Sequence, residues 1–158
     1  MKWKKWLEKW DMTSLKIKAP FLEAEWNPSK SDKNAAWNLY VELLTRITTQ
    51  HLQPDHGDEK AVLESIHTLF AISRQIIKEN GPGCIEFAKI AIVVLNQIVR
   101  PFTAKWHKLS IAGAFEDKQK CIEFRSELAS LQKELRKYTS ALAQIADVED
   151  LTSLEDNN

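Results

Sequence analysis

Cys84 is the side chain that the sequence places best for nucleophilic chemistry. It follows Gly81-Pro82-Gly83 at the expected start of a helix, where the helix dipole and free backbone amides lower the pKa of a thiol. A nucleophilic cysteine also needs a base and an oxyanion hole, and no catalytic motif in the chain supplies them. We therefore expect Cys84, like Cys121, to be a small buried apolar residue.

A second group of reactive side chains lies in the short segment 51–59. It contains possible metal ligands, namely His51, Asp55, His56, Asp58 and Glu59. Their spacing matches no zinc, EF-hand or HExxH pattern, and the chain has no glycine-rich phosphate-binding motif. The sequence therefore predicts no metal site and no cofactor.

Arg100 and His107 are separated by six residues. This spacing resembles the R-x(4–6)-H motif of HEPN-type ribonucleases, which are all-helical domains of similar size. In that family Arg and His from paired subunits polarise the scissile phosphate and transfer protons, so the resemblance implies metal-independent RNA cleavage by these two residues. Pro101 departs from the family's pattern, which commonly has a polar residue after the arginine. Without this activity, Arg100 would complement the carbonyl end of the preceding helix and His107 would be an ordinary helix residue.

The apolar stretch from Ile85 to Val99 is expected to be the central element that positions these residues. Its few polar residues lie near one stripe at helical spacing, which predicts a helix covered on several sides. The stretch is too short and too polar for a membrane span of about 20 residues. Pro101 restricts the residue before it and can occupy the first turn of another helix, so the central helix should end near Arg100.

The C-terminal third carries a heptad pattern, with apolar residues alternately four and three positions apart. They are Phe124, Leu128, Leu131, Leu135, Tyr138, Leu142 and Ile145. This pattern is typical of a long bundle helix or a coiled coil. The predicted fold class is therefore all-α: a single domain over 1–158, with a bundle of four to five helices over 32–146 and an acidic flexible tail over 147–158.

The first eleven residues place Trp3, Trp6 and Trp10 on one helical face, with lysines mostly elsewhere. We expect a short amphipathic helix over 1–11 whose tryptophan face rests at a membrane interface, docks on its own bundle or meets a second copy. Residues 14–26 alternate apolar and polar side chains before Pro20. That alternation predicts an extended or hairpin arm.

Charge and cysteine content limit the classes of function. Lysine plus arginine equals aspartate plus glutamate at 22 each, which argues against nucleic-acid binding unless the chain is HEPN-like. Two cysteines suit a reducing compartment, and lysines and tryptophans interrupt the apolar run that a signal peptide needs. We therefore expect a cytoplasmic protein.

Three segments together resemble a family of uncharacterised bacterial proteins, within about 35–152. They read AAWNLYVELLTRITTQ, VLNQIVRPFTAKWH and EFRSELASLQKELRKYTSALAQIADVEDL. No activity of that family can be carried over to this chain. The resemblance implies a bacterial cytoplasmic protein from a conflict or defence system.

The function that these patterns favour is a non-enzymatic interaction or adaptor module, because aromatic clusters and heptad seams are typical of interfaces. It would self-associate or bind a protein partner through Trp3, Trp6, Trp10, Leu131, Leu135 and Tyr138. The alternatives are an HEPN-like ribonuclease that uses Arg100 and His107, and a peripheral membrane protein anchored by residues 1–11.

Overall fold

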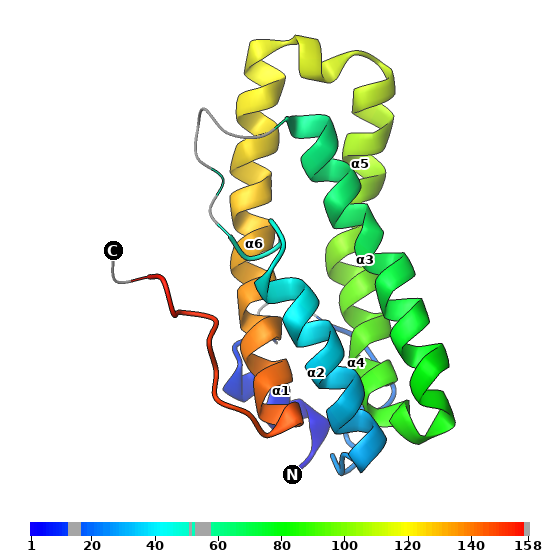
Figure 1. Cartoon of the computed structure of the whole chain (residues 1–158). Coiled ribbons are helices and arrows are strands. Elements are labelled where there is room, and N and C mark those ends of the chain that lie inside the picture. Colours follow the sequence, from blue (N-terminus) through cyan, green and yellow to red (C-terminus); the bar gives the residue numbers. More distant parts are fainter. Residues whose placement is uncertain (13–16, 51, 53–57, 157–158) are drawn as a thin grey trace.

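The structure is a computed structural model that describes residues 1–12, 17–50, 52 and 58–156 (Figure 1). It confirms the all-α fold class, and these residues contain no strand beyond one isolated bridge between Lys2 and Glu25. The helices are α1 (Trp3–Lys9), α2 (Lys30–Leu44), α3 (Glu59–Asn80), α4 (Ile85–Val94), α5 (Arg100–Ile111) and α6 (Lys118–Ala146).

The bundle is built from four helical columns, which can be followed in Figure 1. The first three are α2, α3 and α6; the fourth is α4 followed directly by α5, with a π-helical turn at Leu95–Val99 between them. The α4–α5 column lies beside α3 on one side and α6 on the other, while α2 also lies between α3 and α6. The bundle therefore has two opposite faces, one formed by α2 and α3 and the other by the α4–α5 column and α6.

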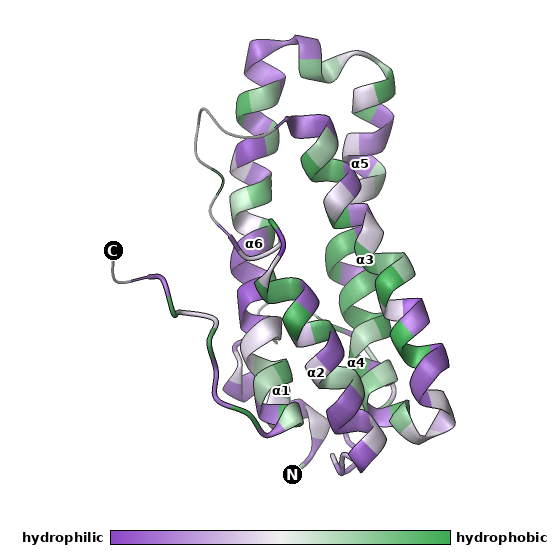
Figure 2. Ribbon diagram, viewed as in Figure 1, coloured by the Kyte–Doolittle hydropathy of each residue, from purple (hydrophilic) through white to green (hydrophobic). Residues whose placement is uncertain are grey.

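The predicted central helix is largely, but not entirely, covered. Ile90 and Val94 are 0% and 1% exposed, whereas Ile85 and Ile92 on the outer side are 56% and 51% exposed. Figure 2 shows α4 as a strongly apolar element of the bundle. The continuous helical run Glu59–Ile111 contains one window long and apolar enough to cross a membrane by length and composition alone, and half of that window is buried in the bundle. The core helix of a folded bundle has the same composition.

The Pro101 break is milder than the sequence suggests. Pro101 lies in the first turn of α5, directly after the π-helical turn, in which the Arg100 N–H donates to the Leu95 carbonyl five residues back. The π-helical turn before it takes up the irregularity, because it widens the helix locally without ending it. As a result α4 and α5 stay in one column.

The carboxylate of Asp32 connects the beginnings of two helices. Its Oδ2 accepts a hydrogen bond from the backbone N–H of Ser29 at 2.6 Å, and its Oδ1 accepts one from the backbone N–H of Phe87 at 2.9 Å. Ser29 is the N-cap of α2 and Phe87 lies in the first turn of α4, so one buried side chain satisfies a free donor at each helix start. This link fixes α2 against α4.

The heptad seam of α6 faces the interior of its own bundle. Leu128, Leu135 and Leu142 are no more than 1% exposed, and Tyr138 is 3% exposed. The seam thus behaves as that of a long bundle helix, one of the two alternatives that its spacing leaves open.

The predicted arm over 14–26 has a different role from a strand. Residues 14–16 lie outside the described part of the chain. Within 17–26, the carbonyl groups of Ala24 and Leu22 accept hydrogen bonds from the backbone N–H groups of Trp3 and Lys4, at 3.0 and 2.9 Å. These two donors open α1 and have no intrahelical partner, so the arm caps the helix.

The acidic segment predicted as a flexible tail is held against α2 as far as the structure describes it. The Tyr40 hydroxyl accepts a hydrogen bond from the backbone N–H of Leu151 at 2.6 Å and donates one to the carbonyl of Glu149 at 3.3 Å. Arg136 on α6 forms an ion pair with Asp156 at 2.5 Å. Residues 157 and 158 lie outside the described part.

Replacing Asp32 with alanine should leave the backbone donors of Ser29 and Phe87 without their acceptor. We expect the free energy of unfolding, measured by urea denaturation, to fall by roughly 2–4 kcal/mol. The exposed neighbour Lys33 serves as control, and Lys33→Ala should change it by less than about 0.5 kcal/mol. Equal effects of the two substitutions would contradict the role given to Asp32.

Candidate functional site

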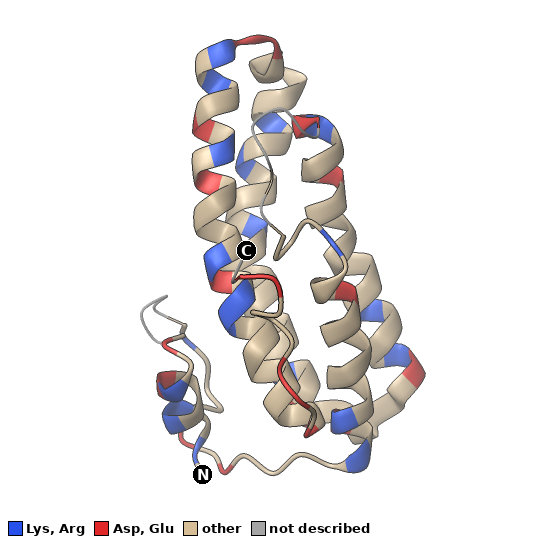
Figure 3. Cartoon of the chain, turned by 60° about the vertical axis from the view of Figure 1, so that its left-hand side comes forward, with Lys and Arg blue, Asp and Glu red and all other residues tan. Residues whose placement is uncertain are grey.

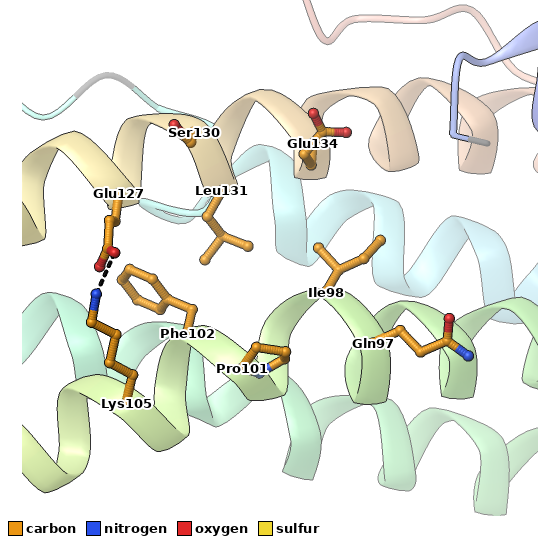
Figure 4. A pocket seen from close by; sticks show the side chains of 9 residues that line it. All are labelled: Gln97, Ile98, Pro101, Phe102, Lys105, Glu127, Ser130, Leu131 and Glu134. Carbon is orange, nitrogen blue, oxygen red and sulfur yellow. Dashed lines mark hydrogen bonds and ion pairs between the residues drawn. The ribbon is translucent and has the colours of Figure 1, made fainter. Parts of the chain in front are cut away.

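A groove of about 420 Å³ opens between α5 and α6 (Figure 4). One wall comes from the π-helical turn and α5, the other from α6. The lining residues are Gln97, Ile98, Pro101, Phe102, Lys105, Glu127, Ser130, Leu131 and Glu134.

The floor of the groove is apolar. Figure 4 shows Ile98, Phe102 and Leu131 pointing into the space between the two helices. Ile98, Phe102 and Lys105 follow one another at helical spacing across the π-helical turn, so they share one side of the column. Beneath them Phe102 packs against Phe124, with ring centroids 5.5 Å apart. The groove therefore opens directly onto the hydrophobic core.

Hydrogen bonds between α5 and α6 bound the groove at its end toward the C-terminal half of α5. The Glu127 carboxylate accepts a hydrogen bond from Lys105 Nζ at 2.5 Å, and its other oxygen accepts one from Trp106 Nε1. Trp106 is fully buried, so Glu127 satisfies an indole donor that would otherwise lack a partner. This network holds α5 and α6 together at this end of the groove.

The other end of the groove meets the N-terminal strap, which we define as residues 1–12 and 17–26. The Gln97 side chain, which lines the groove, accepts from the backbone N–H of Lys18 at 3.0 Å and donates to its carbonyl at 2.7 Å. Gln97 is thus the boundary between the open groove and the segment covered by the strap.

The strap lies across the same pair of columns, α4 and α6. Trp3 Nε1 donates to Glu86 on α4 at 2.9 Å, and Trp10 Nε1 donates to Gln144 on α6 at 3.0 Å. Figure 3 shows the strap beside the lower part of the bundle. The α4–α5 column and α6 therefore form one trough, which the strap fills at the α4 end and which is open at the α5 end.

Aromatic side chains give the strap its own small core. Trp3 lies 5.3 Å from Trp6 and 5.3 Å from Phe21, edge to face, and Trp6 stacks on Trp26 at 5.5 Å. Such pairs add about 0.5–1.5 kcal/mol each beyond the area they bury. A helix of only seven residues could not persist without this packing.

These contacts show where the predicted partner-binding residues lie in the fold. Trp3 and Trp6 are fully buried and Trp10 is half-buried, because the tryptophan face docks on the chain's own bundle. Of the three alternatives left open for this face, the described residues show it docked on the chain's own bundle. The three heptad residues predicted to bind a partner are also buried: Leu131 is 6% exposed, Leu135 is 1% exposed and Tyr138 is 3% exposed. Of the six, Leu131 alone lines the α5–α6 groove.

Arg100 and His107 lie on the side of α5 that faces α3, away from the groove. Arg100 Nε and Nη2 both donate to Asn96 Oδ1, at 3.0 and 2.9 Å, and its guanidinium lies 4.6 Å from the centre of the Phe70 ring. His107 is seven positions beyond Arg100 on the helix, which corresponds to a rise of about 10 Å along the axis. Both residues therefore lie along the boundary between α3 and α5, which we call the α3–α5 seam, without direct contact between them.

Sequence analysis missed a third residue at that seam. The ring of His67 on α3 lies 4.9 Å from the ring of His107. His67 is exposed and His107 is half-buried. Forty residues separate the two histidines in the chain, and no local spacing signals their approach, so only the packing of α3 on α5 reveals it.

Both cysteines have the surroundings of structural rather than reactive residues. Cys84 is fully buried, and burial together with the negative charge of Asp32 raises the pKa of its thiol. Burial and the charge of Glu59 likewise raise the pKa of Cys121. A raised pKa keeps a thiol protonated and unreactive.

The segment considered for a metal site lies mostly outside the described residues. These omit 51 and 53–57, and among those that remain no three His, Cys, Asp or Glu side chains gather as ligands.

Comparisons with protein-family models, curated proteins and solved structures find no match to this chain. The resemblances to the HEPN motif and to an uncharacterised bacterial family therefore stay predictions. What can be said of function rests on the geometry of the groove, the strap and the α3–α5 seam.

Proposed function

We propose that this protein is a non-enzymatic interaction module that binds an amphipathic helix of a partner protein in the α5–α6 groove. One observation carries the proposal. The groove continues the trough between the α4–α5 column and α6, and the strap, which includes α1, already fills the other end of that trough with tryptophan side chains. The chain thus contains an example of the kind of segment that packs between these columns. Helix-in-groove recognition is a common way for proteins to bind peptides.

The groove sets requirements on the partner helix. From Gln97 to Lys105 the column advances by about 12 Å, which corresponds to two turns of a bound helix. The apolar floor of Ile98, Phe102 and Leu131 favours large apolar side chains at positions i, i+3 or i+4, and i+7. At the rim, the Lys105–Glu127 pair and Glu134 favour polar residues of both signs on the flanks of that helix.

A library of helical peptides selected against the full chain tests this proposal. We expect the enriched peptides to share the apolar spacing given above and to compete with one another. Ser130→Arg places a bulky charged side chain in the groove, and it should weaken their binding by at least about tenfold, or 1.4 kcal/mol. The adjacent exposed residue Ala129 does not line the groove, so Ala129→Arg should leave the affinity unchanged.

Two results would reject the groove as a docking site. One is that the library yields no helical binder. The other is that the enriched peptides bind Ser130→Arg as well as they bind Ala129→Arg.

A second candidate function is metal-independent RNA cleavage of the HEPN type. The close approach of His67 to His107, on the seam that also carries Arg100, favours it. A second imidazole beside the first could share the proton transfers that the HEPN resemblance assigns to His107.

Incubating the full chain with single-stranded RNA in the presence of a chelator tests this candidate. This candidate predicts cleavage that is lost in His107→Ala and Arg100→Ala and reduced in His67→Ala. Lys133→Ala changes an exposed residue of α6 and should cleave like the unmodified chain. Absence of cleavage by the unmodified chain, or cleavage that persists in His107→Ala, would eliminate this function.

A further inference from the structure

The opposite face of the bundle carries a second groove, between α2 and α3. Its volume is about 410 Å³, and its apolar residues include Trp37, Val41 and Ile72. Trp37 is 46% exposed and Val41 is 39% exposed. A half-exposed tryptophan beside aliphatic side chains is typical of a protein interface, where such residues contribute most of the binding energy.

The groove runs along only one half of α3. Its α2 wall lies opposite Ile72 to Glu79, in the C-terminal half of α3. The exposed residues of the N-terminal half are Lys60, Ala61, Glu64, His67 and Thr68, and exposed Ala71 follows just past the middle of the helix. One half of α3 therefore borders an apolar groove, and the other presents a mixed surface of charged, polar and small side chains.

Opposite charges mark the two ends of this surface. Glu64, Ala71 and Lys78 are exposed and seven residues apart, so they lie on one line along α3. Within the described parts of the chain, neither Glu64 nor Lys78 forms an ion pair. Both charges are therefore available to a partner.

We propose that a second copy of this chain covers the α2–α3 groove, with the two α3 helices antiparallel about a two-fold axis at Ala71. Glu64 and Lys78 are each seven residues from Ala71, so this register places Glu64 of one copy opposite Lys78 of the other, twice. It also places the N-terminal half of each α3, with the small exposed side chains of Ala61 and Thr68, over the Trp37 groove of the other copy. The contact is self-complementary, as a two-fold interface requires.

This interface is independent of helix binding in the α5–α6 groove. It lies on the face opposite the α5–α6 groove, so self-association leaves that groove open. It also assigns self-association to a surface other than the heptad seam, whose residues are buried inside the bundle.

Sedimentation equilibrium of the full chain tests the interface and its register. We expect the unmodified chain to be a dimer. Lys78→Glu and Glu64→Lys should each weaken dimerisation by at least about tenfold, because each creates two like-charge contacts. The double variant Glu64→Lys/Lys78→Glu restores opposite charges and should regain most of the affinity.

Two further variants separate this interface from others. Trp37→Ala should weaken the dimer by removing the anchor in the groove. Lys133→Glu, an exposed change on α6, should leave it unaffected. Unfolding curves for all variants show whether the exposed substitutions keep the fold. A monomeric unmodified chain, a dimer insensitive to Trp37→Ala, or a double variant no better than the single ones would overturn the proposal.

Discussion

The heptad seam of α6 is the constraint on which the rest of this structure depends. A 29-residue helix with one apolar face must have that face covered along its whole length. The α2 helix covers one flank, and the α4–α5 column with the strap covers the other. The strap covers this second flank only as far as Gln97, which binds Lys18 of the strap. Beyond Gln97 the α5–α6 groove opens over Leu131. The candidate site is thus the part of the second flank that the strap leaves open, above the buried Leu131.

Sequence periodicity was sufficient for the helices because it is local. Each local pattern indicates which face of a helix is apolar. This holds for the heptads of α6, the apolar Ile85–Val99 stretch and the tryptophan spacing of α1. They do not state what covers that face. For α1 and α6 the covering surface is the chain itself, so residues expected to bind partners became core residues. An aromatic face looks the same in sequence whether it docks within the chain or outside it.

The candidate sites depended on features that periodicity does not contain. The groove arises from a π-helical turn, which brings Ile98 and Phe102 to one side, and from the end of the strap, held by Gln97. His67 joins His107 only through the packing of α3 on α5. The prediction that the central helix ends near Arg100 put Arg100 and His107 on successive helices, whereas both lie on α5. Their spacing alone could not show that they face away from the groove. Local patterns gave the helices; long-range packing decided which surfaces remain free.

The most direct test of this account is the solvent exposure of methyl groups along the trough, measured by NMR with a soluble nitroxide. The account predicts strong relaxation enhancement for the methyl groups of Ile98, at the open groove. It predicts weak enhancement for Leu142 and Ile145 of α6 and for Leu7 of the strap, which are 0%, 2% and 0% exposed. Equal enhancement at both ends would mean that the strap does not cover the seam. Protection of Ile98 would mean that the groove is closed, and either result would contradict the account.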